Sequence, residues 1–112
     1  MINLSVDEAY AFDYLSILHV KKEVNSKLTP TWEVCFSHIE KQVSSDLMNE
    51  IVNSDEYKNM IEANQITFNA VEKARYGSIT AKEVDEANML RYKRKLELQA
   101  RFFNNKLTEI KT

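Results

Sequence analysis

The segment TAKEVDEANMLRYKRKLELQARFFNNKLTEI, residues 80–110, contains neither glycine nor proline. Thr80 and Glu83 have the spacing of a capping box, which satisfies two free amides at the start of a helix. No stop signal follows before residue 110, so we expect one unbroken helix over 81–110. A helix of about 30 residues is about 45 Å long, whereas a globular chain of this size is only about 30 Å across. The helix should therefore project, form a long hairpin with the preceding helix, or pack against a second copy of the chain.

Start and stop signals divide the rest of the chain into three further helices. The 112 residues include one glycine and one proline, which favours long helices over strands, because strands need frequent turns. Pro30 suits the first turn of a helix, Ser54 suits a helix cap and Gly77 suits a helix end. The stretch Ser44-Ser45-Asp46 either bends or interrupts the second helix. We predict one all-α domain over residues 1–112, with four helices at approximately 6–24, 30–52, 55–76 and 81–110, the last two forming an antiparallel, coiled-coil-like hairpin.

The composition limits the cellular compartment and the partners that can be expected for the protein. The net charge of −2 gives no general attraction to nucleic acid or to an acidic membrane. The single Cys35 cannot form an internal disulfide, and no stretch resembles a secretion signal or an apolar span of about 18 residues. We therefore expect a cytoplasmic protein without membrane contact. A chain of this size buries only about two-thirds of its unfolded surface, so association with a second copy would add useful stability.

The densest run of positive charge is Arg91-Tyr92-Lys93-Arg94-Lys95. A surface that follows a nucleic-acid backbone needs its charges aligned on one side, but a helical wheel spreads this run around the circumference. Arg91, Arg94 and Arg101 do share one side, and that side is also apolar, which is typical of a helix–helix contact with arginine–carboxylate pairs. The pattern favours packing and ion pairing over an acidic partner, and it disfavours sequence-specific nucleic-acid binding.

The last predicted helix carries apolar residues on two opposite sides. The first set lies within about 80° of arc and is predicted to be the main buried stripe. It consists of Met89, Tyr92, Leu96, Ala100, Phe103, Leu107 and Ile110. The second set consists of Val84, Ala87, Leu90, Leu98 and Phe102. A helix that packs on one layer needs only one apolar stripe, so two stripes indicate the centre of a bundle or the seam of a homodimer.

Residues that could carry chemistry are sparse. Cys35 and His38 lie one turn apart, but zinc needs at least three protein ligands, so we expect a buried thiol and a surface histidine. Glu83 and Glu86 resemble half of the acidic motif of helical, Mg-dependent nucleotide hydrolases, and the second acidic pair is missing. One glycine excludes a glycine-rich phosphate loop. We predict no catalytic residue, no metal site and no cofactor, which favours a non-catalytic role over an enzyme.

Asp13 is an acidic residue within the apolar stripe of the first predicted helix. An isolated buried carboxylate is costly, so Asp13 needs a partner. Arg91 or Arg94 of the last helix would supply the positive charge, and Asn88 could complete the hydrogen bonds. Two interpretations stay open. The group is either a structural buried pair or a polar pocket between the first and last helices that binds a small ligand.

Residues 13–21, DYLSILHVK, resemble the signature D-K-[IL]-[ST]-I-L-x-[IV]-K, which opens a family of small helical bacterial and phage proteins without an assigned activity. Residues 88–93, NMLRYK, are similar to a second motif of that family, N-D-x-R-A-x-[IL]-K. Tyr14 and Met89 depart from the family pattern, which has Lys and Asp at these positions. The resemblance implies a helical fold, and it would make Asp13, Lys21, Asn88 and Arg91 the polar positions shared with the family.

The sequence therefore predicts a non-catalytic interaction or accessory module that forms a homo-oligomer, most simply a homodimer. Two alternatives stay open. The first is a small-ligand binder or enzyme acting on an anionic substrate in a pocket between the first and last helices. The second is a binder of an acidic protein partner or nucleic acid. The candidate ligand-binding residues are Asp13, Lys21, Asn88, Arg91 and Arg94.

Overall fold

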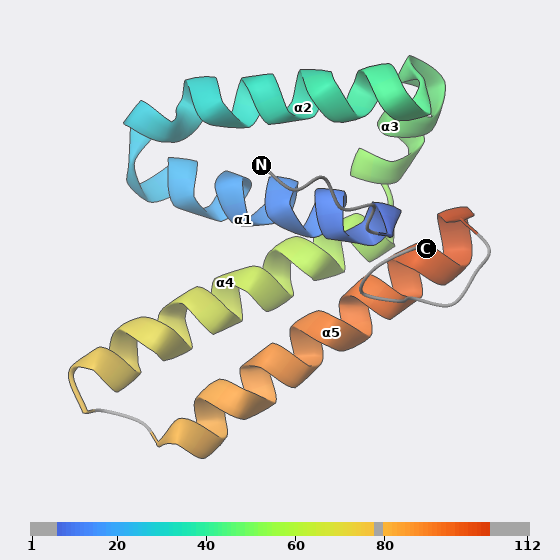
Figure 1. Ribbon diagram of the computed structural model, residues 1–112. Coiled ribbons are helices and arrows are strands. Elements are labelled where there is room, and N and C mark those ends of the chain that lie inside the picture. The colour runs from blue at the N-terminus through green and yellow to red at the C-terminus, as the bar shows by residue number, and fades with distance from the viewer. Residues whose placement is uncertain (1–6, 78–79, 104–112) are drawn as a thin grey trace, which may run out of the picture.

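The computed structural model describes residues 7–77 and 80–103, which form helices and their connections (Figure 1). The elements are α1 (Glu8–Val24), a short 3-10 helix η1 (Ser26–Leu28), α2 (Thr29–Val43), α3 (Ser45–Val52), α4 (Asp55–Arg75) and α5 (Ala81–Phe103). The described residues contain no strand, so the predicted all-α fold is confirmed.

Helix α1 is the central element of the fold. It packs against α2 on one side and against α4 and α5 on the other (Figure 1). Its side chains are therefore buried around much of its circumference, including Phe12, Leu15 and Leu18. The aromatic ring of Phe12 packs edge-on against Tyr57 of α4 and also lies against Phe103 of α5, with centroids 6.4 and 6.2 Å away. The core thus connects α1, near the start of the described chain, to α4 and α5, which come much later in the sequence.

The segment predicted as one helix over 30–52 is two helices, so the described chain has five α-helices and the prediction of four is wrong. Ser44 separates α2 from α3 with a φ of 99° and a ψ of 154°. Its backbone amide donates to the Glu40 carbonyl at 2.9 Å, which ends α2. Its hydroxyl accepts from the Leu47 amide at 3.3 Å, which caps the first turn of α3. The serine stretch therefore interrupts the helix, because one residue serves as the end of α2 and the start of α3.

Helices α4 and α5 lie side by side as a hairpin (Figure 1). Ser54 caps α4 by accepting from the Tyr57 amide at 3.1 Å. Gly77 follows α4 with a φ of 74°, in the left-handed region that glycine adopts easily. Helix α5 is continuous through the basic run, as predicted, and residues 104–110 of the predicted last helix lie outside the described residues.

The structure reverses the predicted roles of the two sides of α5. Met89, Tyr92 and Leu96 are 70%, 47% and 37% exposed, whereas Ala87 and Leu98 on the opposite side are buried. The prediction that this side is the main buried stripe is therefore wrong for Met89, Tyr92, Leu96 and Ala100 in a single chain. Phe103 of the same predicted stripe does pack against Phe12 in the core, and Leu107 and Ile110 lie outside the described residues. The inward side carries Ala87 and Leu98 together with Arg91 and Gln99, whose side chains bond to residues of α1. No helix among the described residues has the length and apolar character needed to cross a membrane.

Candidate functional site

Asp13 of α1 and Arg91 of α5 form an ion pair in which Nη2 lies 2.9 Å from Oδ2. Asp13 is buried, and Arg91 is partly covered. A second cation, Lys95, lies 3.9 Å from the same Oδ2 and 4.3 Å from the centroid of the Tyr10 ring. Arg91 and Lys95 are one turn apart on α5, so both reach the same side of the helix. Two members of the basic run therefore point into the protein, toward one carboxylate.

Helix α4 contributes Asn64 to the same group. Its side-chain amide donates to Asp13 Oδ1 at 2.9 Å and to Ser16 Oγ at 2.6 Å. The Ser16 hydroxyl in turn donates to the Asp13 carbonyl at 2.6 Å. Both carboxylate oxygens of Asp13 are thus bonded, one to α4 and one to α5. This polar group joins three helices in the interior, where an unpaired carboxylate would be costly.

The other predicted partners of Asp13 have different contacts. Asn88 accepts from Arg91 Nη1 at 3.3 Å and donates to the Val84 carbonyl at 3.2 Å. Arg94 pairs with Glu97 of its own helix at 2.6 Å. Arg91 is therefore the arginine that pairs with Asp13, and Asn88 accepts a hydrogen bond from the other terminal nitrogen of its guanidinium. The Nε of Arg91 is buried and has no hydrogen-bond partner among the described residues.

A cleft of about 480 Å³ opens beside this polar group, between α1, α4 and α5. Lys21 and Arg91, two of the predicted binding residues, line it; Asn88 and Arg94 do not. The full lining consists of Ile17, Lys21, Asn64, Thr67, Phe68, Val71, Glu72, Arg75 and Arg91. Thr67 is buried, and its hydroxyl lies 2.9 Å from the Ala63 carbonyl and 3.3 Å from the Ala87 carbonyl, so it ties α4 to α5 at the back of the cleft.

The cleft combines positive charge with an apolar wall. Its lining holds three cations and one carboxylate, Glu72, which lies 3.7 Å from Arg75. That pair is largely exposed to solvent, so it is weak. Ile17, Phe68 and Val71 supply the apolar part of the wall. Asn64 and Arg75 escaped prediction, because a single Asn or Arg in an amphipathic helix looks like any solvent-facing residue.

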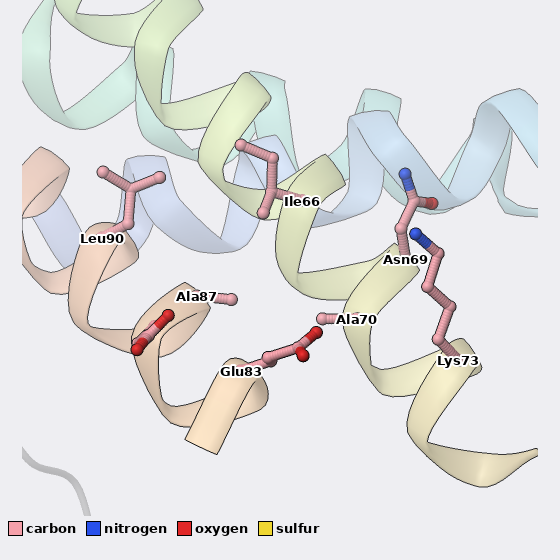
Figure 2. A pocket seen from close by; sticks show the side chains of 8 residues that line it. Ile66, Asn69, Ala70, Lys73, Glu83, Ala87 and Leu90 are labelled. Atoms are coloured by element: carbon pink, nitrogen blue, oxygen red, sulfur yellow. The ribbon is translucent and has the colours of Figure 1, made fainter. Parts of the chain in front are cut away.

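A second, larger groove of about 710 Å³ lies between α4 and α5 toward the hairpin connection. Figure 2 shows Asn69 and Lys73 on α4 and Glu83 on the facing helix. Glu83 and Glu86 both line this groove and are exposed, as expected for a solvated face. No group of three or more potential metal ligands occurs among the described residues.

Cys35 and His38 lie on α2 at a small depression of about 320 Å³. His38 is exposed, and Cys35 is half-buried. Burial raises the pKa of the Cys35 thiol, which keeps it protonated and makes it a poor nucleophile. The Cys35 thiol is therefore a packing group and not a nucleophile.

Gln99 is a polar residue of α5 that no sequence pattern singled out, and it is fully buried. Its Oε1 accepts from the Ala9 amide at 2.8 Å, and its Nε2 donates to Glu8 at 2.9 Å. The N-cap residue Asp7 makes no side-chain cap bond to α1. Gln99 therefore caps the first turn of α1 from a distant part of the chain.

Comparison of the chain with protein-family models, with curated proteins and with solved structures finds no match. The resemblance of residues 13–21 and 88–93 to a family of small helical bacterial and phage proteins stays a prediction. Asp13 and Arg91, which that resemblance selects, are in contact, and Lys21 lies at the neighbouring cleft.

Proposed function

We propose that the protein is a non-catalytic accessory module that forms a homodimer through the outward side of α5. The observation that carries this proposal is the exposed stripe of Met89, Tyr92 and Leu96, on the side of α5 opposite its buried face. Figure 1 shows α5 at the edge of the molecule. Burying a Met or Leu side chain contributes about 1.5–3 kcal/mol, so covering this stripe would add useful stability to a chain of this size.

The spacing along the stripe supports a helix as its partner. Met89, Tyr92 and Leu96 recur at intervals of three and four residues, and the exposed Ala100 follows four residues later. This is the narrow seam of a coiled coil, in which one helix meets another of matching pattern. The same helix from a second copy has that pattern, which makes self-association the simplest occupant.

Charge along α5 supports an antiparallel arrangement. The first part of the helix carries Glu83, Asp85 and Glu86. The second part carries the basic run at residues 91–95 and Arg101. Two antiparallel copies place each acidic part beside the basic part of the partner, where Lys93 is exposed and lies outside the ion pairs made among the described residues, whereas parallel copies place like charges together. Like-charge contacts across an interface are strongly unfavourable, so the antiparallel pair is preferred.

Ion pairing within the chain supports an interaction role over nucleic-acid binding. Arg91 and Lys95 are directed at Asp13, Arg94 pairs with Glu97, and Arg101 pairs with Glu56 at 2.7 Å. Affinity for a nucleic-acid backbone comes largely from cations that replace the counterions of the phosphates. A cation that is already paired with a carboxylate of its own chain contributes little to that affinity. In this proposal the dimer acts in the cytoplasm of a bacterial or phage-infected cell, a setting supported by the sequence resemblance and by the single free cysteine.

The proposal is tested by measuring the mass of the protein in solution. Light scattering at about 50 µM should give twice the chain mass of 13.1 kDa for the unmodified protein, at a concentration above the micromolar range of standard interfaces. Leu96→Lys should give the single-chain mass. Val34→Lys is the matched control, because Val34 is a 55% exposed apolar residue of α2, outside the stripe. A monomeric unmodified protein, or a dimer that Val34→Lys abolishes and Leu96→Lys does not, would count against the proposal.

A further inference from the structure

We propose that the cleft between α1, α4 and α5 binds a small organic monocarboxylate with an apolar body. The cleft has a volume of about 480 Å³, and its lining joins cationic side chains to an apolar wall. It is separate from the outward side of α5, so this inference is independent of the proposed dimer.

The positive charge that would receive the ligand is on Lys21. Two of the three cations in the lining already have carboxylate partners, since Arg91 is paired with Asp13 and Arg75 with Glu72. Lys21 has no carboxylate within salt-bridge distance among residues 7–77 and 80–103, and it is exposed. One uncompensated positive charge matches a ligand with one negative charge.

The arginines add geometry to that charge. A guanidinium presents parallel N–H groups that fit the two oxygens of a carboxylate. The Arg75–Glu72 contact of 3.7 Å is long and exposed, so Arg75 can turn toward a ligand at little cost. Arg91 is held in place by its ion pair with Asp13, so its guanidinium lines the cleft in a fixed position.

The rest of the lining selects the ligand further. Ile17, Phe68 and Val71 form an apolar wall, and Val71 is 42% exposed at the surface. Such a wall suits a short alkyl or aromatic body, because covering it removes apolar surface from water. Glu72 disfavours a phosphate monoester, which carries about −1.5 to −2 charge near neutral pH and would meet like charge in the cleft.

The test is a titration of the full-length protein with hexanoate, followed by the backbone amide signals in a ¹H–¹⁵N spectrum. Saturable shifts are expected at Ile17, Lys21 and Val71. Hexan-1-ol has the same chain without the charge and should bind at least about fivefold more weakly, as expected for the loss of one partly exposed charge-assisted contact. Hexyl phosphate should also bind more weakly than hexanoate.

Two variants place the ligand in this cleft. Lys21→Ala should weaken hexanoate binding at least about fivefold, because it removes the uncompensated charge. Lys73→Ala removes an exposed lysine of α4 that lines the other groove, and it should leave hexanoate affinity unchanged. Both positions are exposed, so both variants should retain the spectrum of a folded protein.

Several outcomes would overturn the inference. Absence of saturable shifts with hexanoate would remove the site. Equal affinity for hexan-1-ol would show a merely apolar depression, and tighter binding of hexyl phosphate would remove the assignment to a carboxylate. Equal weakening by Lys21→Ala and Lys73→Ala would show non-specific attraction to positive charge.

Discussion

Gln99 of α5 caps α1 by accepting a hydrogen bond from the Ala9 amide at 2.8 Å, although 90 positions separate the two residues. The first turn of a helix has free amides that are usually satisfied by a neighbouring Ser, Thr, Asp or Asn. Here part of that role passes to a fully buried side chain from the other end of the described chain. The start of the central helix therefore depends on the docking of α5.

Replacing Gln99 with Leu should lower the free energy of unfolding by about 1–3 kcal/mol, because the Ala9 amide would stay buried without an acceptor. Urea denaturation measures the change. Gln42→Leu is the control, since Gln42 is an exposed residue of α2 and should change the stability by less than about 0.5 kcal/mol. Equal stability of the two variants would mean that water replaces Gln99 at no cost.

Asp13 and Arg91, the two partners of the buried ion pair, should contribute unequally to the free energy of unfolding. Asp13→Ala leaves Arg91, Lys95 and Asn64 without a shared acceptor, so it should cost about 3–5 kcal/mol. Arg91→Ala leaves Asp13 bonded to Asn64 and close to Lys95, so it should cost less, about 1–3 kcal/mol. Chemical denaturation of both single variants and the double variant gives the coupling energy. A larger loss from Arg91→Ala would contradict the central place of Asp13.

Some of these contacts could be predicted from the sequence, and others could not. Asp13 demanded a partner because a carboxylate stood in an apolar stripe, and the arginines of the last helix were the opposite charges available. Asn64 and Gln99 gave no such signal, because a neutral amide in an amphipathic helix is compatible with either water or the interior. Their roles depend on neighbours that are distant in sequence, which a periodic pattern does not reveal.

The fold, too, could be predicted from the sequence only in part. Few chain-breaking residues and clear caps predicted the all-α class and the ends of most helices. The two apolar stripes of α5 did not by themselves indicate which side is buried, whereas the predicted pairing of Asp13 with an arginine of the last helix is met by Arg91 on the inward side. The break at Ser44 was equally open, since three polar residues without glycine or proline can continue a helix or end it.

Replacing Ser44 with Gly should raise the free energy of unfolding by about 0.5–1 kcal/mol. The φ of 99° is unfavourable for any residue with a side chain, and glycine relieves that cost. Glycine is also an acceptable N-cap, so the lost bond to the Leu47 amide costs only a few tenths of a kcal/mol. Ser44→Ala keeps the strain and loses the cap, so it should be destabilising by about 1 kcal/mol. Thermal unfolding should therefore shift in opposite directions for the two variants.

His19 should make stability depend on pH. Burial, and then the positive charge of Lys22, lower the pKa of its imidazole below the ordinary 6.5, although Glu23 acts in the opposite direction. Between the folded pKa and 6.5 the unfolded chain binds more protons, so stability rises with pH through this window and is lost as the pH falls. His19→Gln removes this contribution. The stability of the unmodified protein relative to the variant should increase between about pH 5 and about pH 7.5, and a constant difference would contradict the lowered pKa.

Disulfide trapping should reveal the orientation of the proposed dimer. In an antiparallel pair centred near Arg91, position 82 of one copy lies beside position 100 of the other. Lys82 and Ala100 are both exposed, so cysteines there are accessible. In a Cys35→Ser background, oxidation of a mixture of Lys82→Cys and Ala100→Cys proteins should give the mixed dimer, because a disulfide needs Cα atoms only about 4.4–6.8 Å apart. Either variant alone should cross-link no more than Lys41→Cys, whose position on α2 is exposed and outside the stripe. Efficient cross-linking of Lys82→Cys or Ala100→Cys with itself would instead indicate parallel helices, in which the acidic and basic parts of α5 each face their own kind.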